Sequence, residues 1–555
     1  MQNKLPLINS AHGSETRNII NELIKLFNSM GYTYDEALTN AHNILEEAKI
    51  TNDMNVNVQK QIDDLILSAG ESDAEVINSR GGYPVLRDRL NAMKSQIDEK
   101  AKETELKSLQ QVTSTKFSQS TFNRYGLLDS SELLFDLGFD LYRGTDGRIL
   151  HNFPFHALTS GAPNVYIDRQ RGLDGNDGLT KTTPVQYLKK ALEIANARSE
   201  STVNIVFLEK IVYYSVLEQG VSNNNITLTK NINLLSDHAE GSYIYSGNFP
   251  DGYSWTNDNG IYKTSRTATY QVFDSKFKDF RGNPKKMVKV NSVTQCRNRL
   301  NSWYTDGTSV WVNREDGSNP STDNAVLLIL PINTTFTFNV PGVTFHIDNV
   351  HFYLKQNSGG YNGVTINGNS SSNIIIRRSS FNHATGNGLA VVNFNQLYIF
   401  DSYSEDCGVD AFNYHASAIK SNPIEKVFLY NCYAFNMGYN ANNNGNAFTG
   451  HDGMKIIGVN LIGHDTVGPV LADVNGSDSL YYDCVMYNSK ANVGATKSAF
   501  WSDEALALKT GSMKLINCSG GGDNTHSINT DGKVVPVLQN FNGDIPISLT
   551  VEIVK

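Results

Sequence analysis

The chain has 555 residues, of which 39% are hydrophobic and 10% aromatic, so the composition excludes a wholly disordered chain. Its 44 Gly and 14 Pro residues are too few for a collagen-like or low-complexity chain. The formal net charge of −9 argues against a dedicated nucleic-acid-binding protein, because such a protein needs a basic face to neutralise phosphates.

The start of the chain carries no targeting signal that we can identify. Residues 1–7 show no basic segment followed by a long apolar stretch, so we expect no secretory signal. The longest strongly apolar run, Ala325 to Leu330, is far shorter than the ~20 residues needed to span a bilayer. The five cysteines show no CxxC spacing and predict no disulfide framework. We therefore expect a protein that is made soluble in a reducing cell, without membrane contact.

Residues 1–110 have helical periodicity. One apolar stripe runs from Ile19 to a stop at Gly31, Asp35 can cap a second helix, and a third helical stretch covers about 55–68. Farther along, apolar residues recur in steps of four, three and four, which is the a/d spacing of a coiled-coil seam. These residues are Leu86, Leu90, Met93 and Ile97. Two interpretations stay open: one amphipathic helix lying on its own domain, or an oligomerising stalk.

Residues 111–160 are mixed and polar, and we interpret them as a connector. Beyond residue 160, long helical periodicity is lost except between Pro184 and Arg198. The remainder predicts short alternating strands separated by Asn, Asp and Gly turns. We expect a small β insertion at about 240–335, in which residues 303–307 and 310–312 form a hairpin, and a C-terminal strand or cap over 531–555.

A repeat of short β-rich runs, each ending in a polar residue, fills the second half of the chain. The terminal residues of these runs are separated by steps of 30, 23, 30, 29, 23 and 34 residues. They are Asp348, Arg378, Asp401, Asn431, Asn460, Asp483 and Asn517. Repeats of 20–50 residues built from strands are typical of solenoids. The sequence therefore predicts a mainly β fold, a right-handed parallel β-helix over residues 161–530.

The same alignment gives three cysteines a common position. Cys432, Cys484 and Cys518 each follow a turn residue, so we expect them to stack as small interior residues rather than to serve a metal or redox role. Cys296 and Cys407 receive no assignment.

Residues 164–198 carry a characteristic series: NVYID at 164–168, GNDGL at 175–179, and Thr183-Pro184 followed by the amphipathic stretch. This order resembles the opening of pectate-lyase-like β-helices, in which a helix caps the exposed end of the core. Such a helix covers an edge that would otherwise pair with another chain. The resemblance implies a fold and no chemistry.

Two N-terminal stretches resemble tail and baseplate appendage proteins of phages that infect Gram-positive bacteria. They read GSETRNIIN at 13–21 and SDAEVINSRGGYPVLRDRL at 72–90. The resemblance implies a virion-attachment segment, a coiled stalk, a receptor-directed domain and a homotrimer. It also implies that other tail or baseplate proteins are partners, and that the protein lies in the virion after synthesis in the host cytoplasm without a signal peptide. For a Gram-positive host, it implies a β-helix that binds or cuts wall teichoic acid or a related glycopolymer.

Polar residues crowd into three blocks between residues 405 and 475. Because stacked coils bring their loops to one face, we expect these blocks to line one groove. The candidate catalytic residues are Asp410, His415, His451, Asp452 and Asp473. The candidate substrate-binding residues are Glu405, Asp406, Asn413, Tyr414, Trp501 and Asp503.

Several chemistries fit these residue types. A His beside a carboxylate can act as acid or base on a phosphodiester, and two Asp with two His can instead hold a divalent metal ion. Two carboxylates also suit a glycosidase, whereas a lyase usually needs a basic residue and the three blocks contain no Lys or Arg. In a plainer interpretation, Asp and Asn only hydrogen-bond the turns, and the aromatic residues only pack. His383 and His464 are expected to be surface or satisfied loop histidines.

We favour a phage tail appendage, a tailspike or fibre, that binds and hydrolyses wall teichoic acid at its phosphodiester backbone. Three alternatives stay open: a non-enzymatic receptor-binding fibre, a glycoside hydrolase or lyase acting on capsular polysaccharide, and a purely structural baseplate component. The sequence implies no cofactor with certainty and leaves a divalent metal ion open.

Overall fold

The computed structural model describes residue 128 and residues 133–144, 148–214, 224–247, 252–279, 283–332, 336–356, 362–416, 424–439, 445–490, 498–503, 510–522, 526–530, 534–543 and 551–554. The helices and the coiled-coil seam predicted for residues 1–110 lie outside these residues. Within the described part, no helix is long and apolar enough to cross a membrane.

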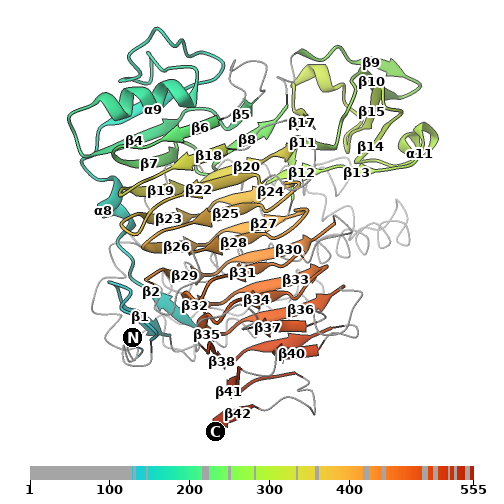
Figure 1. The fold of residues 1–555 in the computed structure, drawn as a ribbon. Coiled ribbons are helices and arrows are strands. Elements are labelled where there is room, and N and C mark those ends of the chain that lie inside the picture. The colour runs from blue at the N-terminus through green and yellow to red at the C-terminus, as the bar shows by residue number, and fades with distance from the viewer. Residues whose placement is uncertain are drawn as a thin grey trace, which may run out of the picture. The chain divides into compact units, whose positions relative to one another are not determined.

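The chain winds into a right-handed parallel β-helix, which confirms the predicted fold class (Figure 1). Each full coil gives one strand to each of three parallel sheets, which we name sheets I, II and III in the order in which the chain visits them. Hydrogen-bonded neighbours within a sheet are about 4.8 Å apart.

Sheet I has twelve strands: β3 (Asn164–Ile167), β4 (Thr202–Phe207), β7 (Asn231–Ser236), β19 (Thr344–Asp348), β23 (Asn373–Arg377), β26 (Gln396–Phe400), β29 (Lys426–Tyr430), β32 (Lys455–Val459), β35 (Asp478–Tyr482), β38 (Ser512–Ile516), β41 (Val537–Gln539) and β42 (Glu552–Val554).

Sheet II has nine strands: β5 (Ile211–Tyr214), β8 (Ser242–Ser246), β20 (Val350–Tyr353), β24 (Ser380–Asn382), β27 (Tyr403–Glu405), β30 (Tyr433–Met437), β33 (Ile462–Thr466), β36 (Val485–Ser489) and β39 (Ser519–Gly521). Sheet III also has nine: β6 (Asn224–Thr227), β18 (Phe336–Asn339), β22 (Val364–Asn367), β25 (Leu389–Val392), β28 (Phe412–His415), β31 (Phe448–Gly450), β34 (Leu471–Asp473), β37 (Ser498–Ser502) and β40 (His526–Thr530).

The corner between sheets I and II is made by a residue with a positive φ angle. The predicted turn residues occupy this position, except the first, where Asn349 (φ 61°) rather than Asp348 makes the corner. Asn and Asp adopt this left-handed conformation more readily than other residues with a side chain. Their side chains also bond from coil to coil: Asn431 donates to Asp401 at 2.8 Å, and Asn460 donates to Asn431 at 2.9 Å. The predicted repeat is confirmed.

The interior of the β-helix is a continuous column of apolar side chains. Phe412 and Phe448, in register on adjacent strands of sheet III, stack with their rings 4° from parallel. Cys432, Cys484 and Cys518 are buried in the same core, which confirms the predicted interior position. Of the two unassigned cysteines, Cys407 joins this core and Cys296 is buried in the insertion.

One helix covers the N-terminal end of the core. Helix α9 (Leu188–Ala197) contacts β3 and β4 and buries Leu188, Ala191, Leu192 and Ala195. It lies within the predicted stretch Pro184 to Arg198, and Figure 1 shows it beside the first strands of the β-helix.

The end of the predicted connector is an apolar arm on the outer face of sheet I. It contains β1 (Leu141–Arg143), β2 (Ile149–His151) and α8 (Phe155–Thr159). Apolar residues of the arm pack against outward side chains of sheet I; the buried members of this cluster are Phe135, Leu137, Leu141, Ile149, Ile375, Tyr398, Phe400, Phe428, Ile457, Val459, Leu480, Tyr482 and Ile516. The apolar residues of the arm have no regular period, so the sequence gives no sign of this packing.

A β insertion follows β8 and ends before β18. Its elements are β9 (Thr256–Asp258), β10 (Ile261–Ser265), β11 (Gln271–Lys278), β12 (Pro284–Lys286), β13 (Val288–Lys289), α11 (Val293–Arg297), β14 (Ser302–Thr305), β15 (Ser309–Asn313), η3 (Pro320–Thr322), β16 (Val326–Ile329) and β17 (Pro331–Ile332). Strands β14 and β15 pair antiparallel, with Trp303 opposite Val312, so the predicted hairpin is confirmed. Strand β17 pairs with β21 (Lys355–Gln356), which follows β20.

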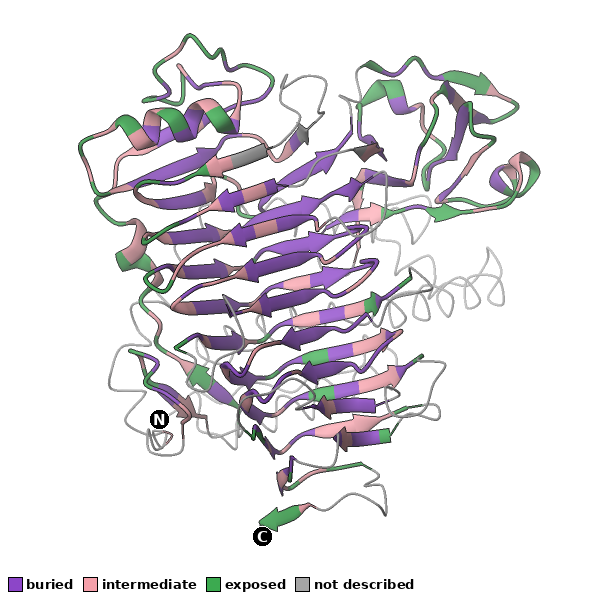
Figure 2. Cartoon of the chain, in the orientation of Figure 1, coloured by how far each residue is buried: buried purple, intermediate pink, exposed green. Residues whose placement is uncertain are grey.

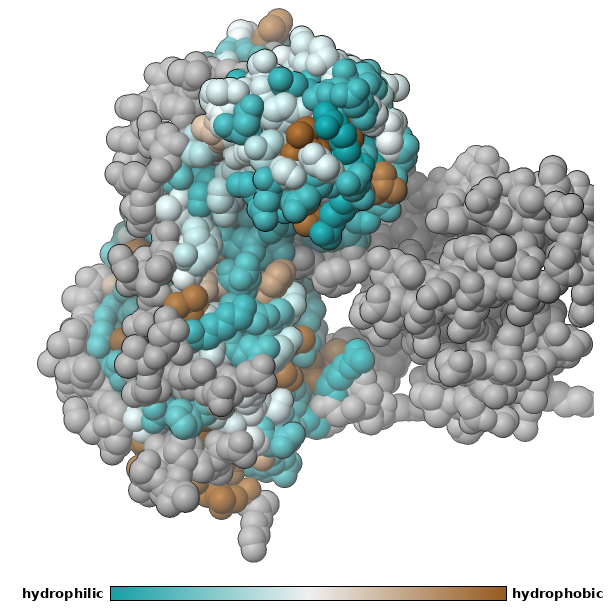
Figure 3. Space-filling view, turned by 90° about the vertical axis from the view of Figure 1, so that its right-hand side faces the viewer, coloured by the Kyte–Doolittle hydropathy of each residue, from teal (hydrophilic) through white to brown (hydrophobic). Residues whose placement is uncertain are grey.

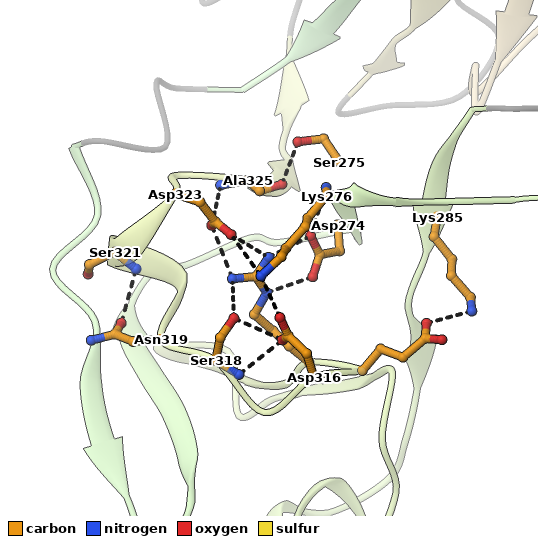
Figure 4. Close-up of polar contacts among 12 residues, drawn as sticks. Asp274, Ser275, Lys276, Lys285, Asp316, Ser318, Asn319, Ser321, Asp323 and Ala325 are labelled. Atoms are coloured by element: carbon orange, nitrogen blue, oxygen red, sulfur yellow. Dashed lines mark hydrogen bonds and ion pairs between the residues drawn. The ribbon is translucent and has the colours of Figure 1, made fainter. Parts of the chain in front are cut away.

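A buried arginine holds the insertion together, and Figure 4 labels the two carboxylates that bind it, Asp274 and Asp323. The fully buried Arg314 donates to both carboxylate oxygens of Asp274, at 2.7 and 2.9 Å, and to both of Asp323 at 3.0 Å. A charge of this kind is tolerated in an interior only when its donors are satisfied. Arg314 therefore fixes β11 and the segment after η3 to the end of β15.

Candidate functional site

The candidate site lies on the outer side of sheet III, where β28 and β31 end. Side chains alternate along a strand, so Phe412 and Tyr414 of β28 point into the core while Asn413 and His415 point outward. The pairing of β28 with β31 continues one residue further, because His451 N donates to Tyr414 O at 3.1 Å. This register places His415 beside His451. Their rings stack with centroids 3.9 Å apart and an interplanar angle of 11°.

Asp452 holds the outer of the two imidazoles. Its Oδ2 lies 3.3 Å from Nδ1 of His415, and its Oδ1 accepts a hydrogen bond from Asn475 Nδ2 at 3.2 Å. Burial alone would raise the pKa of Asp452, but the bonds from His415 and Asn475 outweigh it and the pKa is lowered. Asp452 is therefore a carboxylate at neutral pH. It fixes a proton on Nδ1 of His415, leaving Nε2 as the basic nitrogen.

The second imidazole, His451, is neutral. Burial, followed by the proximity of His415, lowers its pKa to about 3. Asn413 Nδ2 lies 3.4 Å from Nε2 of His451 and also donates to Asp410 Oδ2 at 2.5 Å. Because an amide nitrogen can only donate, Nε2 of His451 accepts and its proton lies on Nδ1. Both rings therefore carry their proton on Nδ1. The nitrogen outside these contacts is the acceptor Nε2 in His415 and the donor Nδ1 in His451.

Asp410 anchors this arrangement from below the surface. The residue is 4% exposed, and its Oδ1 accepts from the backbone N–H of Asn446 at 2.8 Å. Burial raises the pKa of Asp410 to about 6, against the opposing effect of the Asn413 and Asn446 bonds. By contrast, the side chain of His415 is 37% exposed and that of Asp452 is 13% exposed. The group that solvent reaches is thus the His415–Asp452 pair.

Two predicted site residues lie inside the core, so the prediction that they line a groove is wrong. Asp473 is 1% exposed, points inward from β34 and accepts a hydrogen bond from the Tyr481 hydroxyl at 2.8 Å. Its burial raises its pKa to about 7. Tyr414 is also 1% exposed, and Gly450, in register with it, leaves room for its ring. A block of polar residues does not reveal which of its members point inward.

Two other predicted residues lie on sheet II and not beside the stacked histidines. Glu405 is the last residue of β27, and Asp406 follows it with a φ angle of 55°. Asp406 pairs with Lys286 of the insertion and accepts a hydrogen bond from Asn436. His383 is fully buried, with Nδ1 3.5 Å from Asp406 Oδ2, so it is not a surface histidine. This cluster attaches the insertion to the β-helix.

The remaining predicted residues share the outer side of sheet III. Trp501 of β37 is in register with Ala472, Thr449 and Asn413, three strand spacings or about 14 Å from Asn413. Asp503 lies one coil from Asn475 and accepts a hydrogen bond from its backbone N–H at 3.2 Å. Trp501 and the histidine pair therefore lie on the same side of sheet III.

Asn475 is a site residue that the sequence analysis missed. A comparison of coils would have found it, because Asp452-Gly453 after β31 and Asn475-Gly476 after β34 occupy equivalent positions and all four residues have positive φ angles. Among the described residues, no group of three or more His, Cys, Asp or Glu side chains is placed to hold a metal ion. The described side chains therefore give no support to the divalent metal ion that the sequence leaves open.

No family model and no curated protein matches the sequence. Solved structures with some likeness include a chain described as a glycoside hydrolase, at 10% identity and a TM-score of 0.38, over 70% of this chain and 99% of the other. The native GH136 lacto-N-biosidase from Eubacterium ramulus matches at 10% identity and a TM-score of 0.26, over 70% of this chain and 66% of the other. Its selenomethionine derivative matches at 8% identity and a TM-score of 0.32, over 71% and 66%. Superpositions this loose say nothing about what this chain acts on.

Proposed function

We propose that this protein is a phage tail appendage whose β-helix binds a host cell-wall glycopolymer and hydrolyses its phosphodiester backbone, with wall teichoic acid as the substrate. The observation that carries the proposal is the stacked His415–His451 pair, in which Asp452 holds one ring and Asn413 the other. The phage origin and the trimer rest on the resemblance of residues 13–21 and 72–90.

The geometry suits acid–base catalysis by His415. Nε2 of His415 takes a proton from a water molecule as the water oxygen attacks phosphorus, and Asp452 stabilises the imidazolium that forms. The bond from phosphorus to the leaving oxygen then breaks, and the imidazolium returns the proton to the leaving alkoxide. Neutral His451 can donate a hydrogen bond from Nδ1 to a phosphoryl oxygen without the cost of burying a charge.

A phosphodiester fits the site better than a glycosidic bond does. A glycosidase needs two carboxyl groups on either side of the sugar. Of the three candidates, Asp452 is near solvent, but Asp473 lies inside the core and both oxygens of Asp410 are occupied by Asn413 and Asn446. A glycoside hydrolase would have to rearrange these bonds before the second carboxyl could reach a sugar.

The test is incubation of the purified full chain with wall teichoic acid, followed by mass spectrometry of the soluble products. Phosphoglycerol or phosphoribitol fragments are expected from the native chain, and a loss of at least a hundredfold in their rate of release from His415→Ala. His156→Ala, an exposed histidine of α8, is the matched control and should keep full activity.

The rival functions give different products. Reducing ends or unsaturated sugars from capsular polysaccharide, without phosphate-bearing fragments, would establish a glycoside hydrolase or lyase and overturn the proposal. Saturable wall binding without any product, unaltered in Asp452→Asn, would establish a receptor-binding fibre.

A further inference from the structure

A second aromatic surface lies on the outer face of sheet II, outside the histidine site. Phe435 of β30, His464 of β33 and Tyr487 of β36 occupy the same register on successive strands. Their rings stack as a column: the centroids of Phe435 and His464 are 5.2 Å apart at 14°, and those of His464 and Tyr487 are 4.8 Å apart at 13°. Strand spacing sets this stacking distance, so the next ring of the column belongs about 4.8 Å beyond Tyr487.

The column ends at a glycine. Tyr487 pairs with Gly521 of β39, and a Cβ atom built on Gly521 would meet no atom within 4 Å among the described residues. Among the described residues of the next coil, none therefore places a side chain on the ring face of Tyr487 that turns toward β39. In the part of the chain that the structure describes, nothing fills the place that a fourth ring would take.

The described residues of the insertion leave this part of sheet II partly exposed. Upstream in the same sheet, Tyr245 and Tyr353 are fully buried together with Phe273 of β11. Figure 2 shows the contrast: β8 and β20 are buried throughout, whereas β30, β33 and β36 carry intermediate and exposed residues. In the side view of Figure 3, hydrophilic residues predominate on the insertion and hydrophobic residues form separate patches.

Polar groups flank the open ring. Asp465 accepts from His464 Nδ1 at 2.7 Å and from Lys490 at 3.1 Å, and the side chain of Lys490 is 56% exposed. The next residue of β36, Asn488, lies against Gly522 of the following coil, where a Cβ atom would come within 2.3 Å of its Oδ1. A flat apolar face edged by an ammonium group, a carboxylate and an amide matches a pyranose, which has one apolar C–H face and a rim of hydroxyl groups.

We propose that Tyr487 is the platform of a sugar-binding site on sheet II, at which one pyranose ring of a cell-surface glycopolymer stacks as the fourth member of the Phe435–His464–Tyr487 column. The acidic net charge and the carboxylate of Asp465 disfavour a nucleic acid, whose bases would also stack on such a ring. The site stands on a different sheet from the stacked histidines and does not depend on the proposed hydrolysis. A polymer held at both places would gain affinity through a raised effective concentration.

The test compares two probes, poly(glycerol phosphate) carrying glucosyl substituents and the same polymer without them, titrated calorimetrically into the full chain. The native protein should bind the glucosylated probe at least tenfold more tightly. Tyr487→Ala should lose that difference, Tyr487→Phe should keep it, and Tyr142→Ala on the arm should behave as the native chain. Thermal unfolding of each variant reports whether it is folded.

Equal binding of both probes by the native chain, or unchanged discrimination by a folded Tyr487→Ala, would overturn the sugar site. A change of oligomeric state in Tyr487→Ala, measured by sedimentation, would show that the ring packs on another copy and would also overturn it. Hydrolysis of bis(p-nitrophenyl) phosphate, followed in parallel, should be unaffected by Tyr487→Ala and lost in His415→Ala. The two proposals can therefore fail separately.

Discussion

His415 and His451 are 36 residues apart in the sequence, yet their imidazole rings lie face to face with centroids 3.9 Å apart. One coil of the β-helix separates them, so the distance is set by strand spacing rather than by any bond between the rings. Asn413 binds Nε2 of His451 and Asp452 binds Nδ1 of His415, so the two rings carry their proton on the same nitrogen but engage different nitrogens.

Replacing Asp452 by Asn should reduce kcat by a factor of at least a hundred and leave KM for teichoic acid nearly unchanged. The amide keeps the volume of the carboxylate but cannot stabilise an imidazolium at His415. Steady-state kinetics on purified polymer measure both constants. A rise in KM with an unchanged kcat would mean that Asp452 only binds substrate.

The buried carboxyl of Asp473 should make stability fall as pH rises. Its pKa is about 7 in the folded protein, against about 3.9 in an unfolded chain, so the folded state binds the proton more tightly. The contribution of this proton to the free energy of unfolding is complete below about pH 4 and is lost as pH rises through about 7. The difference in free energy of unfolding between Asp473→Asn and the native chain should therefore shift in favour of the variant between pH 5 and 8. A difference that does not vary with pH would contradict this assignment.

Gly450→Ala should destabilise the protein by about 1–3 kcal/mol, as overpacked cores do. The added Cβ would lie 2.3 Å from Ile456 Cδ1 and 3.0 Å from Tyr414 Cε2. Gly175→Ala is the matched control, because a Cβ there meets nothing within 4 Å. Denaturant unfolding of the two variants gives the comparison, and equal stabilities would show that the core around Tyr414 is loosely packed.

Arg314→Met should destabilise the insertion by about 3–5 kcal/mol, because it leaves the carboxylate of Asp274 buried without its partner. Adding Asp274→Leu to the same chain should recover most of the lost stability, since the second change removes the buried carboxylate that has no partner. Thermal unfolding of the single and double variants tests this. A double variant no more stable than the single one would show that the bonds to Asp323 dominate.

The β-helix could be predicted because its corners require residue types that can be recognised in the sequence. Asp401, Asn431 and Asn460 recur where a left-handed residue is needed, and the short apolar runs before them mark sheet I. The sequence does not fix the first corner to one residue, because Asp348 and Asn349 are both turn-prone and only the register with β23 distinguishes them.

The candidate site could be predicted only in part. Residue types indicated Asp410, His415, His451 and Asp452, and coil stacking brings these four into one chain of contacts through Asn413. Their catalytic role stays a prediction. The side chain of Asp473 points inward because of the register of β34 with β31. A run of polar residues in the sequence does not fix that register. The attachment of Asp406 to Lys286, 120 residues away, has no local signal at all.

The corner between sheets I and II has a constant length of two residues from β23 to β39, although whole coils differ between 23 and 34 residues. All the variation in length therefore falls on the segments that enter and leave sheet III, beside the histidine pair. A scaffold built this way can exchange those segments without disturbing the register of its neighbours. Under the proposed function, a change of target polymer would then require new segments there alone, with the supporting coils left as they are.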